Sequence, residues 1–78
     1  MIKYHKQAEK FILSQSKPTA LRLYDAIEKL PLGDVKRLQG SQSPPLFRLR
    51  VGGFRVVFCV EQDITTILRI DTRGDVYK

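Results

Sequence analysis

Residues 46–60 read LFRLRVGGFRVVFCV, and this pattern predicts a tight β-hairpin. Two alternating apolar runs flank Gly52-Gly53, and glycine readily takes the positive φ angles that a two-residue hairpin turn needs. The turn fixes the register of the two strands. The cross-strand pairs on one face are then Val51–Phe54, Leu49–Val56 and Phe47–Phe58.

The second face of this hairpin carries arginines. Side chains alternate between the two faces of a strand, so Arg50 is expected opposite Arg55, and Arg48 opposite Val57. Like charges directly across a strand pair repel and destabilise a sheet, and a small domain has little stability to spare. The arrangement favours a surface built for an anionic partner such as a phosphate backbone. From the residues alone, a solubilising sheet face is the alternative.

Length and charge define the broad class of the protein. The chain has 78 residues, which predicts one domain, 1–78, with one core. A hydrophobic content of 42% is enough for a packed globule, and the net charge is +6. A basic domain of this size favours nucleic acid, an acidic protein or a charged membrane surface as its partner.

Cysteine and histidine usage argues against metal sites and disulfides. Cys59 is the only cysteine and His5 the only histidine, so no internal disulfide forms and no usual metal-ligand spacing exists. We expect no metal, no cofactor and an inert thiol at Cys59, although alternation places it on the same face as the arginines. Neither a signal peptide nor an apolar run of roughly 20 residues is visible. We therefore expect a cytoplasmic protein without membrane contact.

The segments before the hairpin predict one strand and two helices. Residues 1–4 are expected to form a short strand, and helical spacing of apolar residues predicts a helix over about 6–15. A second helix is expected from Pro18, which suits a first helical turn, to about Leu30. Residues 31–45 are predicted to be a loop, because proline, glycine and polar residues dominate them.

A further strand is predicted over about 65–70, after a turn around Gln62-Asp63. A two-residue loop would place Arg69 on the apolar face, whereas a three-residue loop places Leu68 and Ile70 there and Arg69 with the other arginines. Burying an unpaired arginine is costly, so we predict the three-residue loop.

The predicted fold class is α+β, with a short N-terminal strand, a helical hairpin and then an antiparallel sheet of three further strands. The helices are expected to cover the apolar face, and the opposite face is expected to stay open.

Three segments in this order resemble the RelE/ParE family of toxins from bacterial type II toxin–antitoxin systems. They are LGDVKRLQG at 32–40, FRLRVGGFRVVF at 47–58 and LRIDTRGDVY at 68–77, and the resemblance covers essentially the whole chain. RelE members are ribonucleases that cut mRNA in the ribosomal A site. The resemblance implies metal-free cleavage, in which the RNA 2′-hydroxyl attacks the adjacent phosphorus and leaves a 2′,3′-cyclic phosphate and a 5′-hydroxyl.

The resemblance also implies roles for individual residues. The positions that carry catalytic basic groups and a tyrosine in the family match Arg48, Arg50, Arg55, Arg73 and Tyr77. Guanidinium groups can stabilise charge on the phosphorane, and Tyr77 is the candidate base because arginine stays protonated. Many members carry histidine and arginine where this chain has Thr72 and Gly74. Further RNA contacts are expected from Lys36, Arg37, Arg69 and Lys78.

The implied partners are a cognate antitoxin, mRNA on the ribosome and, only as a toxin–antitoxin complex, operator DNA. The antitoxin is expected to be acidic, partly disordered when free, and folded over the basic sheet face or along the helices. Two other functions fit the resemblance. One is a ParE-like inhibitor of DNA gyrase, and the other is a catalytically degenerate member that binds only RNA or its antitoxin.

Overall fold

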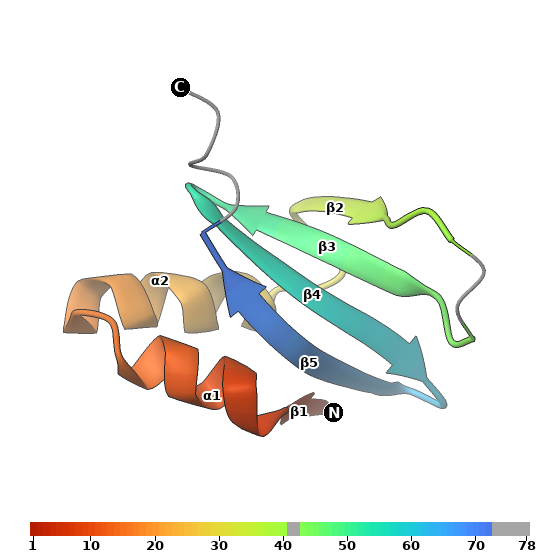
Figure 1. Cartoon of the computed structure of the whole chain (residues 1–78), viewed down its shortest axis with the longest axis horizontal. Helices are drawn as coiled ribbons and strands as arrows, with labels where there is room; N and C mark the ends of the chain where they lie inside the picture. The colour runs from red at the N-terminus through yellow and green to blue at the C-terminus, as the bar shows by residue number, and fades with distance from the viewer. Residues whose placement is uncertain (41–42, 73–78) are drawn as a thin grey trace.

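A five-stranded sheet with two helices on one face forms the protein (Figure 1). The computed structural model describes residues 1–40 and 43–72. The strand order across the sheet is β1-β5-β4-β3-β2. The elements are β1 (Ile2–Tyr4), α1 (Lys6–Leu13), α2 (Lys17–Glu28), β2 (Asp34–Arg37), β3 (Leu46–Val51), β4 (Phe54–Glu61) and β5 (Ile64–Asp71).

The hairpin of β3 and β4 confirms the prediction made from residues 46–60. Val51 pairs with Phe54 across the two-residue turn, and Arg50 pairs with Arg55 one step further along. Gly52 has a φ of +57°, a left-handed conformation that glycine takes without steric penalty. The turn chemistry and the alternation therefore specify this part of the sheet locally.

The hairpin of β4 and β5 differs from the prediction. Its turn has two residues, Gln62 and Asp63, both with positive φ, as in the turns that suit strand twist. Near this turn Phe58 pairs with Ile67, but beyond it Val57 pairs with Arg69, so Leu68 is one extra residue in β5.

Both registers considered from the sequence therefore exist in this one strand, joined by a β-bulge. The predictions of a three-residue loop and of Leu68 on the apolar face were wrong. The bulge supplies the register shift that the longer loop was expected to give, and Ile67 is buried in place of Leu68. Arg69 is exposed and Ile70 is buried, as predicted.

The sheet is larger than predicted. Within the expected loop at 31–45, β2 pairs antiparallel with β3, so four strands rather than three follow the helices. Its Val35 packs against the core while its neighbours in the strand are exposed. At the other edge, β1 pairs parallel with β5, so the sheet is mixed.

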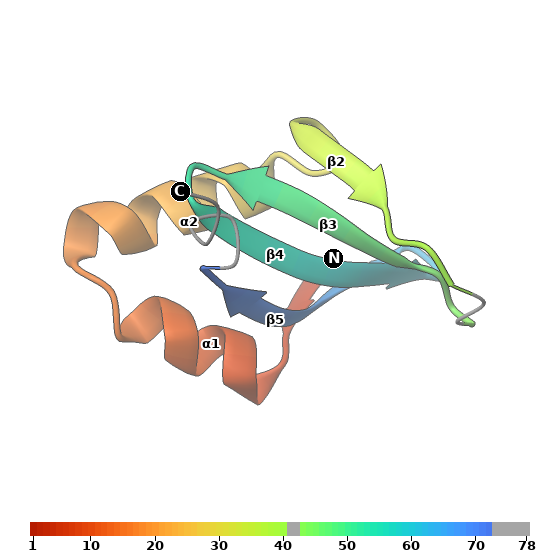
Figure 2. The same cartoon turned by 45° about the horizontal axis from the view of Figure 1, so that its top comes forward.

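The helices cover one face of the sheet, as predicted (Figure 2). Pro18 lies in the first turn of α2, as expected. By contrast, α1 ends at Leu13, two residues earlier than expected, and there the Ser14 hydroxyl donates to the Phe11 carbonyl at 2.6 Å.

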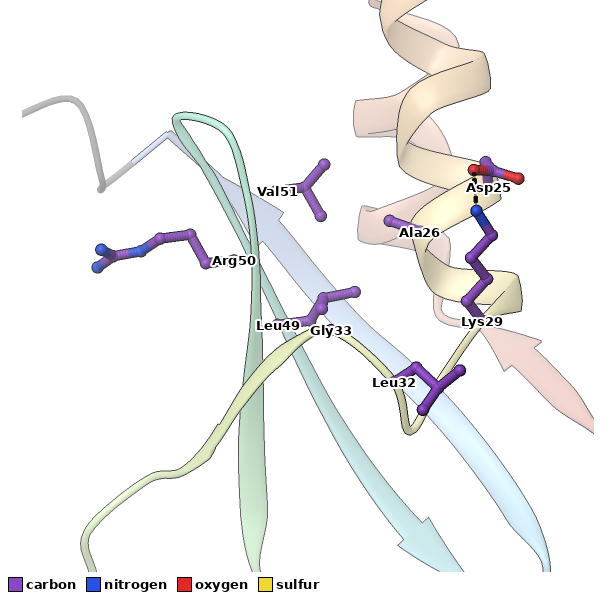
Figure 3. A pocket seen from close by; sticks show the side chains of 8 residues that line it. All are labelled: Asp25, Ala26, Lys29, Leu32, Gly33, Leu49, Arg50 and Val51. Carbon is purple, nitrogen blue, oxygen red and sulfur yellow. Dashed lines mark ion pairs between the residues drawn. The ribbon is translucent and has the colours of Figure 1, made fainter.

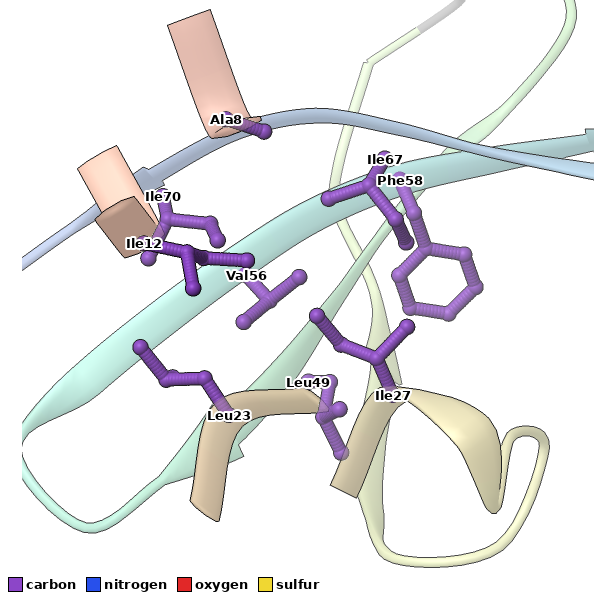
Figure 4. Close-up of a cluster of buried hydrophobic side chains, with 9 residues drawn as sticks. All are labelled: Ala8, Ile12, Leu23, Ile27, Leu49, Val56, Phe58, Ile67 and Ile70. Atoms are coloured by element: carbon purple, nitrogen blue, oxygen red, sulfur yellow. The ribbon is translucent and has the colours of Figure 1, made fainter. Parts of the chain in front are cut away.

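The hydrophobic core lies between the helices and the sheet, and each fully buried aliphatic side chain contributes about 1.5–3 kcal/mol to stability. The core comprises Ala8, Ile12, Leu23, Ile27, Leu49, Val56, Phe58, Ile67 and Ile70 (Figure 4). Neither helix of the described residues is long and apolar enough to cross a membrane.

Candidate nucleic-acid interface

The sheet face opposite the helices carries charged side chains in two neighbouring rows that run across the strands. We call this surface the arginine face and define it by these two rows. In β2-to-β5 order, the first row is Asp34, Arg50, Arg55 and Asp71, and the second is Lys36, Arg48, Val57 and Arg69.

The separation of the two sheet faces is visible in β3 (Figure 3). The Val51 side chain extends toward α2, whereas the Arg50 side chain extends away from it. A shallow pocket of about 220 Å³ lies between α2 and β3, and its lining includes Ala26, Leu32 and Leu49. Arg50 also lines this pocket, so the pocket borders the arginine face at that residue.

Arg55 is held by a carboxylate on the next strand. Its Nη2 atom lies 3.0 Å from Oδ2 of Asp71, and the two side chains are 22% and 36% exposed. On its other side, Arg55 faces Arg50. The repulsion predicted between these two arginines is thus partly compensated within the protein, because Asp71 lies at the end of the same row. The Arg55 Nε atom is buried and has no hydrogen-bond partner among the described residues.

Arg48 is held in a similar way at the edge of the sheet. Its Nη1 atom lies 3.3 Å from Oδ1 of Asp34 and donates to the Asp34 backbone carbonyl at 3.1 Å. The Arg48 side chain is 15% exposed, whereas that of Asp34 is 61% exposed. The backbone contact depends on the pairing of β2 with β3, so the strand that the sequence did not predict positions a predicted site residue.

The remaining cations of the arginine face are exposed. Within residues 1–40 and 43–72, Arg50, Arg69 and Lys36 form no ion pair. Val57, which lies between Arg48 and Arg69 in the second row, is 2% exposed. The face therefore combines two arginines that carboxylates hold in place with three cations that are available to an anion.

The other predicted site residues are placed differently. Arg37 pairs with Phe47 in register, so alternation puts it on the opposite side of β2 from Lys36, away from the arginine face. Arg73, Tyr77 and Lys78 lie outside the described residues. Sequence reasoning missed Asp34 because β2 was predicted as a loop, and it missed Asp71 because the predicted strand ended at about residue 70, whereas β5 extends to Asp71.

Two other titratable groups have raised pKa values. Cys59 pairs with Thr66 near the arginine face, and burial, with a smaller effect of Glu61, raises the pKa of its thiol. A raised thiol pKa lowers the fraction of thiolate, which is the nucleophilic form of cysteine. On the helix side, burial together with Glu28 and Tyr24 raises the pKa of Tyr4 to about 12. The Tyr4 hydroxyl has no hydrogen-bond partner within the described part of the chain.

Comparisons with known proteins agree on one family. A family model described as the ParE toxin of a type II toxin–antitoxin system matches residues 2–77. A chain of the archaeal RelE–RelB complex from Pyrococcus horikoshii OT3 is 30% identical, with a TM-score of 0.74 and 96% of each chain covered. Comparison with curated proteins gave no match.

Two further structures share the fold at lower identity. A chain of the RelB–RelE antitoxin–toxin complex from Methanococcus jannaschii is 23% identical, with a TM-score of 0.72, and the match covers 96% of this chain and 94% of that one. A chain of the DinJ–YafQ toxin–antitoxin complex from E. coli is 17% identical, with a TM-score of 0.64 and coverages of 100% and 97%.

Proposed function

Since the chain belongs to the RelE/ParE family of toxins of type II toxin–antitoxin systems, we propose that it is a RelE-type endoribonuclease that cuts mRNA in the ribosomal A site. The observation that carries this proposal is the arginine face. Arg48 and Arg55 contact carboxylates, and Arg50 and Arg69 are exposed beside them on the sheet face opposite the helices. Fixed and exposed guanidiniums side by side suit a phosphate that must be bound and then stabilised in a transition state.

The proposed reaction uses the substrate's own nucleophile. The RNA 2′-hydroxyl attacks the adjacent phosphorus, the bond to the 5′-oxygen breaks, and a 2′,3′-cyclic phosphate and a 5′-hydroxyl are formed. Negative charge that develops on the phosphorane oxygens is stabilised by Arg48, Arg50 and Arg55. Arginine does not accept a proton at neutral pH, so we assign removal of the 2′-hydroxyl proton to the phenolate of Tyr77. Arg73 stabilises the leaving 5′-oxygen, which takes its proton from water to give the 5′-hydroxyl. The ribosome contributes by positioning the message.

We also propose that an acidic antitoxin neutralises this toxin. The similar chain from Pyrococcus horikoshii was crystallised in a RelE–RelB complex, and the net charge of +6 suits an acidic partner. A segment that covers the arginine face would block the message and remain bound through the exposed cations. Operator DNA is proposed as a ligand of the toxin–antitoxin complex only.

A second candidate function is inhibition of DNA gyrase. The family model that matches residues 2–77 is described as a ParE toxin, and this observation favours it. A gyrase inhibitor acts by binding a protein, so it needs no arrangement of guanidiniums around a phosphate. The two functions therefore differ in their dependence on the arginine face.

The decisive experiment maps 5′ ends on a message in a purified translation system, with and without ribosomes. Wild type is compared with Arg55→Ala and with Lys10→Ala, a matched loss of one positive charge at an exposed position of α1. We expect ribosome-dependent cuts at A-site codons by wild type and Lys10→Ala, and a rate lower by about 10²–10³ for Arg55→Ala. Thermal melts of each variant verify that the fold is intact.

An intact message with all variants would refute the nuclease proposal. Gyrase supercoiling is measured in parallel with the same proteins. Inhibition by wild type and Arg55→Ala alike would then assign the ParE-like function.

A further inference from the structure

We propose that Asp34 and Asp71 are positioning residues that hold Arg48 and Arg55 against the sheet and occupy guanidinium edges that RNA phosphates would otherwise take. The carboxylates thereby restrain non-specific binding of polyanions while keeping two guanidiniums in fixed orientations. For its effect on cleavage this inference rests on the proposed nuclease function, whereas its effect on RNA binding does not.

The first observation is the order of charges across the sheet. One row reads acid, base, base, acid, from Asp34 through Arg50 and Arg55 to Asp71. A carboxylate and a phosphate are recognised by guanidinium in the same way, through N–H donors directed at anionic oxygens. Each terminal carboxylate contacts one guanidinium, Asp71 that of Arg55 in the same row and Asp34 that of Arg48 in the second row, and is therefore an internal substitute for a phosphate oxygen.

The second observation is that the Arg55–Asp71 pair is only partly exposed. Its 3.0 Å contact joins two side chains that are 22% and 36% exposed, so water screens it less than it would an exposed pair. By contrast, Lys29 and Asp25 form a 3.1 Å pair on α2 with side chains 63% and 68% exposed (Figure 3). The two pairs have similar contact distances and differ in location, which supplies a matched control.

The two carboxylates are not equivalent. Arg48 also donates to the backbone carbonyl of Asp34 at 3.1 Å, and this contact does not involve the Asp34 carboxylate. Arg55 has its ion pair with Asp71, and its Nε atom is buried without a partner among the described residues. Loss of the Asp71 charge should therefore release Arg55 more completely than loss of the Asp34 charge releases Arg48.

Three roles for Asp71 predict different combinations of results. A positioning residue predicts that Asp71→Asn binds RNA more tightly but cuts it more slowly, since the released guanidinium binds phosphate without a fixed orientation. A purely structural role predicts weaker binding and slower cleavage together. Simple charge repulsion of RNA predicts tighter binding and faster cleavage together.

The test measures binding of a short single-stranded RNA with a 2′-deoxy substitution at the cleavage position, by fluorescence anisotropy over a range of salt concentrations. Wild type, Asp71→Asn, Asp34→Asn and the control Asp25→Asn are compared, and the last three share the same change in net charge. For single-stranded RNA, one additional phosphate contact steepens the slope of log K against log salt concentration by about 0.7, which raises the affinity about five-fold near 0.1 M salt. We expect this change for Asp71→Asn, a smaller one for Asp34→Asn and little change for Asp25→Asn.

Cleavage is then measured in the purified translation system as kcat and KM. We expect a lower kcat for Asp71→Asn with KM unchanged or lower, and partial rescue of kcat by Asp71→Glu. Equal increases in RNA affinity for Asp71→Asn and Asp25→Asn would overturn the inference. It would also be overturned if Asp71→Asn bound RNA no more tightly than wild type, or did not bind at all, at salt concentrations down to about 20 mM. If wild type does not cut RNA, the proposed function fails, and the salt dependence of binding alone decides the inference.

Discussion

Substitution of Gly52 by alanine tests whether the turn of the β3–β4 hairpin determines the geometry of the arginine face. Gly52 has a φ of +57°, and Arg50 and Arg55 pair with each other one step beyond the turn. An L-residue in this conformation costs about 1–2 kcal/mol, and alanine returns about 0.4–1 kcal/mol by restricting the unfolded chain. We expect a net loss of about 1 kcal/mol in the free energy of unfolding.

The structure also gives the steric part of this cost. A Cβ atom on Gly52 would lie 2.8 Å from Nη2 of Arg22, which is the far end of a flexible side chain. Arg22 can move away, so the backbone conformation and not the clash should dominate. A double-mutant cycle with Arg22→Ala is therefore expected to give a coupling energy below about 0.5 kcal/mol.

Thermal and urea unfolding followed by circular dichroism provide the measurement. A loss of 1 kcal/mol lowers Tm by about 4–8 °C in a domain of this size. Gly53→Ala is the matched control, because Gly53 does not have a positive φ. Equal Tm shifts for the two alanine variants would refute the reasoning, since only Gly52 requires the left-handed region.

Three further predictions concern the core and the buried polar groups. Ile27→Ala removes a fully buried side chain and should lower the free energy of unfolding by about 2–5 kcal/mol, whereas Ile27→Val should cost about 0.5–1.5 kcal/mol in the same urea titration. The pKa of Tyr4 is about 12 in the folded protein and about 10 for a free phenol, so the unfolded chain loses this proton first and stability falls as pH rises from about 10 through 12. Tyr4→Phe should remove that part of the pH dependence, and an unchanged slope would contradict the assignment. Cys59→Ser should leave the cleavage rate unchanged, because burial raises the pKa of the thiol and so disfavours the nucleophilic thiolate; a large loss in the translation assay would instead assign the thiol a role.

The sequence predicted those parts of the fold that local rules control. A two-residue turn flanked by alternating apolar residues sets the β3–β4 register without help from the rest of the chain. By contrast, β2 has exposed polar residues around a single apolar position, Val35, and follows a segment rich in proline and glycine. Its extended conformation comes from hydrogen bonding to β3, a non-local interaction that a composition-based prediction of a loop cannot include.

The same distinction applies to the arginine face. Alternation placed Arg48, Arg50 and Arg55 together, because that relation depends on one hairpin. Each ion pair joins two neighbouring strands: Asp34 of β2 contacts Arg48 of β3, and Asp71 of β5 contacts Arg55 of β4. The first pair needs β2, which was predicted as a loop, and the second needs β5 to extend to Asp71, one residue beyond the predicted strand. The identity of the cations was thus predictable, whereas which of them are paired and which are exposed was not.

The bulge at Leu68 has a consequence for how the family can vary. Residues 64–67 of β5 pair with β4 in one register, and residues 69–71 pair in the other. The position of the extra residue between them is limited, because each shift changes which side chains of β5 face the core. Moving the extra residue from Leu68 to Ile70 would pair Arg69 with Val56 on the buried face, and burying an unpaired arginine is costly. Moving it toward the turn would exchange Ile67 for Leu68 at the core, which replaces one aliphatic side chain by another of similar volume. A turn that is one residue longer at 62–63 would give the second register along the whole strand and would remove the need for the bulge. The pairing of residues 69–71 with β4, and with it the arginine face, would then stay unchanged.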